Sequence, residues 1–163
     1  MNKAVFLDRD GVINRKGSGY YVFRVEEFFF NKGVKEALKY FISEGYLLII
    51  ITNQGGIARG IYSLSHLEKL NNFMIQQLKE SDIEITDIFY CPHHPDISPC
   101  LCRKPGTLLF EQAIAKYDID PKASFMIGDS DIDIQAAEKM NIRGILIPTN
   151  GNMMDIVQSG IIE

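Results

Sequence analysis

Short apolar runs alternate with longer amphipathic stretches along almost the whole chain, and this alternation limits the folds that are open to it. The apolar runs predict five strands, at residues 4–7, 46–51, 88–90, 124–127 and 144–147. The run at 46–51 is almost entirely apolar and rich in branched residues, which is typical of a strand covered on both faces. Repeated strand–helix units indicate a mainly parallel sheet.

The amphipathic stretches between these strands predict four helices, at residues 34–44, 65–80, 108–117 and 131–140. Gly45 ends the first helix, and Ser65 followed by Glu68 predicts a capping box for the second. Neither an internal repeat nor a linker interrupts the pattern. We therefore expect residues 1–163 to form a single domain with a doubly wound α/β fold.

The composition excludes several classes of protein. With 46% hydrophobic and 23% charged residues among 163, the chain can bury a substantial core and is not a disordered tail. A net charge of -4 and the lack of a stripe rich in lysine and arginine argue against binding to nucleic acid. No apolar run approaches the ~18 residues of a membrane span, and no leader precedes the first strand. We expect a cytoplasmic monomer that acts on a small molecule, without contact to a membrane.

Polar residues follow three of the predicted strands. Asp8 and Asp10 follow the first strand, Thr52 and Asn53 follow the second, and Asp129 follows the fourth. In a parallel sheet, the carboxyl ends of the strands face the crevice in which ligands bind. Each of these patterns alone is more often a polar turn, but their joint occurrence indicates an active site.

Three carboxylates that converge on one edge require positive charge nearby. Oxygen ligands of this kind favour a hard divalent cation, most simply magnesium. Lys104 offers a second positive charge, which would keep a nucleophilic carboxylate ionised and neutralise a substrate phosphate. Thr52 and Asn53 are candidates for hydrogen bonds to phosphoryl oxygens. These residues together predict phosphate chemistry.

A segment rich in proline carries all three cysteines of the chain. Cys91 and His93 form one arm of a possible metal site, and Cys100 and Cys102 form the other. Three thiolates and one imidazole are the ligands of a closed, structural zinc site. His94 is the alternative fourth ligand, and reduced cysteines beside a surface histidine are the alternative to any metal. Zinc would supply folding energy to this loop and fix the direction of the two basic residues that follow it.

Four motifs resemble those of the haloacid dehalogenase superfamily of phosphotransferases and cover almost the whole chain. They are residues 8–12, Thr52, Lys104 and residues 128–133. The resemblance implies a Rossmann-like parallel sheet. No insertion in the chain is long enough to form a large cap domain. We therefore expect a zinc-stabilised loop in the place of such a domain.

The same resemblance implies roles for the aspartates. Asp8 would be the nucleophile that accepts the phosphoryl group as an aspartyl phosphate, and Asp10 would be the general acid and then the general base. Magnesium would bind to Asp8, to Asp129 and to the backbone carbonyl of Asp10. Asp133 would support the site from behind, with Asp131 as the competing candidate for that place.

Three further stretches resemble the branch of the superfamily that contains the histidinol-phosphate and heptose bisphosphate phosphatases, and they are more similar to the heptose type. They are residues 52–60, residues 91–95 and the pair Gly19 and Tyr20. The resemblance implies a magnesium-dependent phosphatase that converts heptose bisphosphate to heptose 1-phosphate. Gly19 and Tyr20 would contact this sugar.

Two arginines are candidates for holding the second phosphate of such a substrate. A guanidinium group can bind phosphate through two parallel hydrogen bonds, and Arg59 and Arg103 are the residues expected to do so.

Histidinol phosphate, which carries an imidazole and an amine, is the alternative substrate. A non-catalytic module that binds phosphate or zinc is an alternative of a different class, and both Asp10 and Lys104 argue against it.

Overall fold

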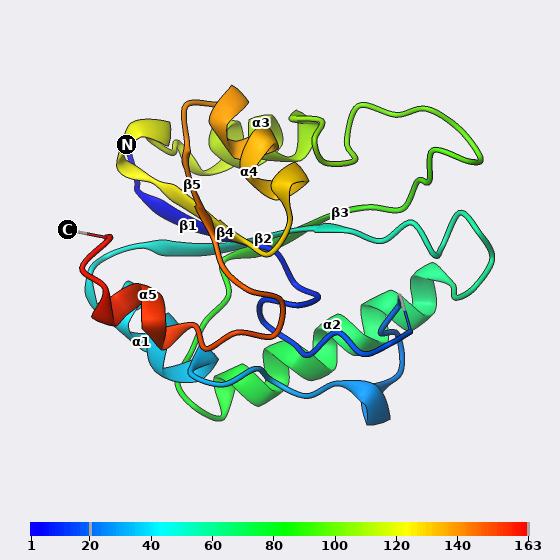
Figure 1. Cartoon of the computed structure of the whole chain (residues 1–163), viewed down its shortest axis with the longest axis horizontal. Coiled ribbons are helices and arrows are strands. Elements are labelled where there is room, and N and C mark those ends of the chain that lie inside the picture. Colours follow the sequence, from blue (N-terminus) through cyan, green and yellow to red (C-terminus); the bar gives the residue numbers. More distant parts are fainter. Residues whose placement is uncertain (20, 163) are drawn as a thin grey trace.

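Strand β1 lies in the middle of a five-stranded parallel sheet with the order β3-β2-β1-β4-β5 (Figure 1). A computed structural model describes residues 1–19 and 21–162. The strands are β1 Ala4–Leu7, β2 Leu47–Asn53, β3 Asp87–Cys91, β4 Phe125–Gly128 and β5 Arg143–Leu146. The predicted parallel α/β fold is confirmed.

Helices cover both faces of this sheet. The helices are α1 Val34–Ser43, α2 Leu64–Lys79, α3 Leu108–Tyr117, α4 Asp131–Lys139 and α5 Met154–Gln158. Helices α3 and α4 lie on one face, whereas α1, α2 and α5 lie on the other (Figure 1). The fold is therefore doubly wound, as the strand–helix alternation predicts.

The alternation of side chains along β1 divides the core into two layers. Val5 and Leu7 pack on the side of α1, α2 and α5, and Ala4 and Phe6 pack on the side of α3 and α4. All four side chains are fully buried. This burial on both faces explains why the strand is a continuous apolar run without alternating polar residues.

Some boundaries differ from those predicted. Strand β2 continues to Asn53, because Thr52 and Asn53 pair with Tyr90 and Cys91 of β3. Helix α5 was not predicted, since its five residues are too few to show a helical period. The extra length of β2 matters for function, because it carries Thr52 and Asn53 to the edge of the sheet.

The predicted capping box at Ser65 and Glu68 is wrong. Helix α2 begins at Leu64, and its N-cap is Ser63. The Ser63 hydroxyl accepts a hydrogen bond from the His66 backbone N–H at 3.3 Å, and His66 Nδ1 accepts one from the Ser63 backbone N–H at 3.1 Å. An imidazole thus takes the place of the glutamate or glutamine of the usual capping box.

The loops that follow the strands carry no cap domain in the part of the chain that the structure describes. Among the described residues between β1 and α1, the only helix is the 3-10 turn Val25–Glu27, and the segment between β3 and α3 contains neither a helix nor a strand. Among the described residues, no helix combines the length and the apolar character needed to cross a membrane.

The core assignment of Phe6 can be tested by truncation. Its side chain is fully buried, and its ring centroid lies 5.2 Å from that of Phe110 in α3. We expect Phe6→Ala to lower the free energy of unfolding by about 3–5 kcal/mol, because the truncation leaves a cavity. Phe29→Ala is the matched control: this ring is 61% exposed, and its removal should change stability by no more than about 0.5 kcal/mol. Urea denaturation measures both, and similar losses would contradict the core assignment.

Candidate active site

The carboxyl ends of β1, β2 and β4 open into a cavity of about 350 Å³. Its lining includes acidic, basic and amide side chains from several loops. The predicted site residues that line it are Asp8, Asp10, Asn53, Arg59, Arg103, Lys104 and Asp129. The parallel sheet thus brings together residues that are up to 121 positions apart in the sequence, 8 to 129.

The ammonium group of Lys104 lies at the buried end of this site. Lys104 Nζ contacts Asp8 Oδ1 at 3.0 Å and Asp133 Oδ1 at 2.7 Å, and it donates a hydrogen bond to the Ile51 carbonyl at 2.7 Å. Burial alone would lower the pKa of Lys104, but the carboxylates of Asp8 and Asp133 outweigh it and raise that pKa above its ordinary value. The lysine is therefore a fixed positive charge beside Asp8.

Asn53 holds the backbone of Lys104 in place. Its Oδ1 accepts a hydrogen bond from the Lys104 backbone N–H at 3.0 Å, and its Nδ2 donates one to the Lys104 carbonyl at 3.2 Å. The side chain thus pairs with the loop in the way that a neighbouring strand would. Asn53 also lines the cavity, so its predicted place beside a phosphate and this bracing role are compatible.

Asp8 lies among several charged groups. Burial raises the pKa of its carboxyl to about 7, and the carboxylates of Asp133, Asp10 and Asp129 act in the same direction, whereas Lys104 acts against them. One lysine is thus too little positive charge to keep Asp8 fully ionised at neutral pH. The chemistry of the site calls for a further cation.

Asp8, Asp129 and Asp133 each present a carboxylate oxygen within 4.8 Å of the others. Asp133 is already occupied, since its Oδ1 contacts Lys104 and its Oδ2 accepts a hydrogen bond from the Ser130 backbone N–H at 3.3 Å. Asp131, its competitor in the sequence, is exposed. Asp8 and Asp129 remain as the side chains suited to a cation, with Asp133 behind them.

Two residues shape the position of Asp129. Thr149, which follows β5, donates a hydrogen bond from Oγ1 to Asp129 Oδ2 at 2.8 Å. Gly11 has a φ of +87°, and a Cβ at this position would lie 2.2 Å from Asp129 Oδ2. Only glycine suits both this backbone conformation and this close approach. The turn predicted after β1 indicated a structural role for Gly11, but no sequence pattern indicated that Thr149 would bind Asp129.

Asp10 is held by a group of buried donors. Arg9 is fully buried and donates to Asp10 Oδ1 through Nε at 3.2 Å and Nη2 at 3.0 Å, and Asn14 Nδ2 donates to the same oxygen at 3.0 Å. Gln54 Nε2 donates to Asp10 Oδ2 at 3.1 Å and to Thr52 Oγ1 at 2.9 Å. Thr52 is thus bound to the network around Asp10, and only 1% of its surface is exposed.

Basic and aromatic side chains also line the cavity. Arg103 Nη1 donates to the His93 carbonyl at 3.3 Å, and Arg59 Nη1 donates to the Tyr21 hydroxyl at 3.3 Å. Lys16 and His94 also line the cavity. Arg59 and Arg103 were predicted from the sequence to contact the substrate. Lys16 and Tyr21 were not predicted, and His94 was considered only as a zinc ligand.

The structure does not bring Gly19 to this cavity. Gly19 is exposed and lines a separate surface hollow, and Tyr20 lies outside the described residues. Tyr21 lines the cavity instead. The sequence marked this segment through the pair Gly19 and Tyr20, and Tyr21 directly follows that pair.

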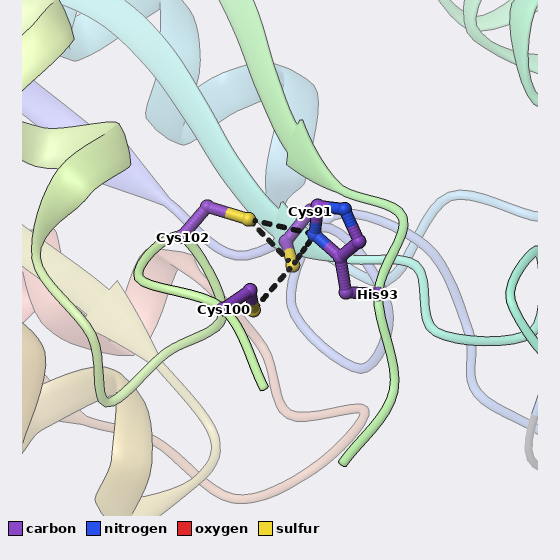
Figure 2. Close-up of side chains that lie close together, drawn as sticks. All are labelled: Cys91, His93, Cys100 and Cys102. Atoms are coloured by element: carbon purple, nitrogen blue, oxygen red, sulfur yellow. Dashed lines mark hydrogen bonds between the residues drawn. The ribbon is translucent and has the colours of Figure 1, made fainter. Parts of the chain in front are cut away.

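The side chains of Cys91, His93, Cys100 and Cys102 converge on one point (Figure 2). Their ligand atoms all lie within 4.8 Å of one another, with His93 Nδ1 as the nitrogen. The Cys91 and Cys102 sulfurs are 2.9 Å apart, and the Cys91 and Cys100 sulfurs are 3.7 Å apart, both too far for a disulfide bond of ~2.05 Å. This arrangement suits a tetrahedral metal site.

His94 points elsewhere. Its Nδ1 accepts a hydrogen bond from the Asp96 backbone N–H at 3.2 Å, and the residue lines the cavity near Asp8. Between the two candidates for the fourth ligand, the geometry favours His93. Arg103 and Lys104 follow directly after Cys102, so the cluster anchors the segment that enters the active site.

Known phosphatases resemble this chain in sequence and in fold. The HAD-hydrolase-like family matches residues 101–159. A D-glycero-alpha-D-manno-heptose-1,7-bisphosphate 7-phosphatase of Photorhabdus laumondii is 42% identical, over 99% of this chain and 91% of its own. A protein of the same name from Campylobacter jejuni is 44% identical, over 91% of this chain and 83% of its own.

The crystal structure of a D,D-heptose 1,7-bisphosphate phosphatase from B. bronchiseptica, complexed with magnesium and phosphate, has the same fold. Its TM-score is 0.84 at 31% sequence identity, and the match covers 97% of this chain and 87% of that one. The chain therefore belongs to the heptose 1,7-bisphosphate 7-phosphatase family of haloacid dehalogenase-like hydrolases, and it is a phosphatase.

Proposed function

We propose that the protein hydrolyses D-glycero-D-manno-heptose 1,7-bisphosphate at the 7-phosphate and leaves heptose 1-phosphate. The observation that carries this proposal is a cavity with Asp8 and Lys104 in contact at 3.0 Å and with Arg59 and Arg103 in its lining. Cationic side chains suit a second phosphate, whereas they would repel the protonated amine of histidinol phosphate. The names of the relatives also favour the heptose substrate.

Asp8, Asp129 and the backbone carbonyl of Asp10 would hold Mg²⁺. The carboxylates of Asp8 and Asp129 fit this role, because oxygen ligands suit a hard cation and these oxygens lie within 4.8 Å of one another. When bound, the cation would neutralise phosphoryl charge and favour the ionised form of Asp8. The related structure that contains magnesium and phosphate supports this assignment.

The reaction proceeds in two displacements. Asp8 attacks phosphorus, an oxygen–phosphorus bond forms on its carboxylate, and the bond to the sugar oxygen breaks. Asp10 gives its proton to that leaving oxygen and afterwards takes a proton from the water that attacks the aspartyl phosphate. The bond between phosphorus and the Asp8 carboxylate breaks, inorganic phosphate leaves, and the free carboxylate of Asp8 is restored. Lys104 stabilises the negative charge that the phosphoryl group carries in both transition states.

Cys91, His93, Cys100 and Cys102 would hold a structural Zn²⁺. The loop between β3 and α3 has neither a helix nor a strand to stabilise it, so a metal would provide much of its folding energy. All four positions are protein ligands, which leaves no place for a catalytic water. The metal would fix the direction from which Arg103 and Lys104 enter the cavity.

The nucleophile can be tested with an isosteric amide. We expect Asp8→Asn to lower kcat by roughly 10³-fold or more while the melting curve stays cooperative, because an amide has the same volume but does not attack phosphorus. Asp131→Asn is the matched control, since Asp131 is exposed and should leave kcat within about twofold. Activity of Asp8→Asn close to that of the unchanged protein would refute the covalent mechanism.

Neighbouring histidines give a paired test of the zinc site. Protein purified without chelator should contain about one zinc per chain, because one four-ligand site holds one ion. His93→Gln should lose most of this zinc and lower the melting temperature, whereas His94→Gln should keep it. Elemental analysis of both variants provides the measurement. Retention of zinc by His93→Gln and its loss by His94→Gln would exchange the two roles, and no zinc in any sample would refute the site.

Arg103 can be tested through the choice of substrate. Loss of one charge-assisted hydrogen bond costs about 1.5–3 kcal/mol, so Arg103→Ala should lower kcat/KM for the heptose bisphosphate by about 10- to 150-fold. A generic aryl phosphate, which has no second phosphate, should be affected much less. Arg143→Ala removes an exposed guanidinium from β5 and serves as the control. Equal losses on both substrates would place Arg103 at the shared phosphoryl position, and faster hydrolysis of histidinol phosphate would overturn the heptose assignment.

A further inference from the structure

Two buried polar side chains, Gln54 and Tyr62, are linked to Asp10 by consecutive hydrogen bonds. Gln54, of which only 2% is exposed, donates from Nε2 to Asp10 Oδ2 at 3.1 Å and to Thr52 Oγ1 at 2.9 Å. Its Oε1 accepts a hydrogen bond from the Tyr62 hydroxyl. Both amide hydrogens and the amide oxygen of Gln54 therefore have partners.

Tyr62 is held firmly in the position from which it reaches Gln54. It is 4% exposed, and its ring stacks on that of Phe23 with the centroids 5.0 Å apart and an interplanar angle of 9°. A Cβ at Gly56 would lie 2.2 Å from the Tyr62 ring, so glycine at this position is what admits the ring. Burial raises the pKa of Tyr62, which keeps its hydroxyl a neutral donor.

The two oxygens of Asp10 are not equivalent. Oδ1 accepts hydrogen bonds from Arg9 Nε, Arg9 Nη2 and Asn14 Nδ2, at 3.2, 3.0 and 3.0 Å. Oδ2 accepts one from Gln54 at 3.1 Å and a longer one from Arg9 Nη2 at 3.3 Å. Three donors crowd Oδ1, so Oδ2 is the oxygen with room for a proton. A protonated carboxyl oxygen still accepts a hydrogen bond, so Gln54 can stay in place whether Asp10 carries its proton or not.

From these contacts we infer that Gln54 and Tyr62 are positioning residues for proton transfer by Asp10. The Tyr62 hydroxyl binds the amide oxygen of Gln54 and so turns its NH₂ group toward Asp10 Oδ2, which holds that oxygen in one orientation. Without the hydroxyl, the Gln54 oxygen loses its donor, and rotation of the amide would place an oxygen against the carboxylate of Asp10. This inference rests on the proposed role of Asp10 as the general acid.

Tyr62→Phe tests the inference, because it removes the hydroxyl and keeps the ring that stacks on Phe23. The readout is kcat/KM for two esters of similar size, phenyl phosphate and p-nitrophenyl phosphate. This ratio reports the step in which Asp8 is phosphorylated and the leaving oxygen takes a proton, and it excludes the later hydrolysis step that both esters share. Phenol is the weaker acid, so its release needs protonation more. General acid catalysis contributes about 10²–10⁴-fold, and a misplaced acid should lower kcat/KM for phenyl phosphate about tenfold. For p-nitrophenyl phosphate the loss should stay within about twofold.

Tyr117→Phe is the matched control. It removes the hydroxyl of a half-buried tyrosine that donates to Asp87 at 2.6 Å, and neither residue lines the cavity. It should change neither the rates nor their ratio. Gln54→Glu keeps the shape of the side chain but removes the donor to Asp10, and it should reproduce the loss that is selective for phenyl phosphate. Circular dichroism and melting curves establish that each variant is folded.

Equal losses of kcat/KM on the two esters would overturn the positioning role. Both esters lack the sugar, so failure of the protein to hydrolyse heptose bisphosphate would refute the proposed substrate and leave this comparison intact. If the unchanged protein releases phosphate from neither ester and Asp10→Asn does not alter turnover of the sugar, then Asp10 is not the general acid and the inference fails with that assignment.

Discussion

The active site depends on one buried charge, the ammonium group of Lys104. It contacts Asp8 after β1 and Asp133 in α4, and it donates to the Ile51 carbonyl in β2, so segments far apart in the sequence meet at one nitrogen. An ion that loses its partners in a protein interior costs several kcal/mol, so arrangements that separate these groups are strongly disfavoured. The strand order, with β1 between β2 and β4, is what lets all of them reach the lysine.

The loop that delivers Lys104 has almost no regular structure of its own. It is fixed from two sides: Asn53 binds the Lys104 backbone through both ends of its amide, and the cluster around Cys102 lies two residues earlier in the chain. The cysteine–histidine cluster therefore helps to position residues of the catalytic cavity. Disturbing the cluster would move Arg103 and Lys104 together, which couples the stability of the loop to the geometry at Asp8.

Sequence patterns succeeded where the cause of a feature is local. Each strand was located by its apolar run. Asp8, Asp10, Asn53 and Asp129 line the cavity because parallel strands end at a common edge. Thr52 was expected there too, but it is buried and bound to Gln54 instead. The start of α2 was misplaced, because His66 caps it in a way that the usual signature does not include. Gln54 and Thr149 were missed, since their partners Tyr62 and Asp129 are defined by contacts in space and by no fixed spacing.

The sequence by itself determined the alternation of strands and helices, the acidic and basic residues at the strand ends, and the grouping of three cysteines with two histidines in one loop. These features follow from side-chain periodicity and from residues that are close in the chain. Only the tertiary structure decided that Asp133 binds Lys104, that His93 and not His94 joins the cysteines, and that Tyr21 reaches the cavity in place of Gly19. Each of these outcomes depends on the direction of a side chain within a packed fold, and packing is a property of the whole chain.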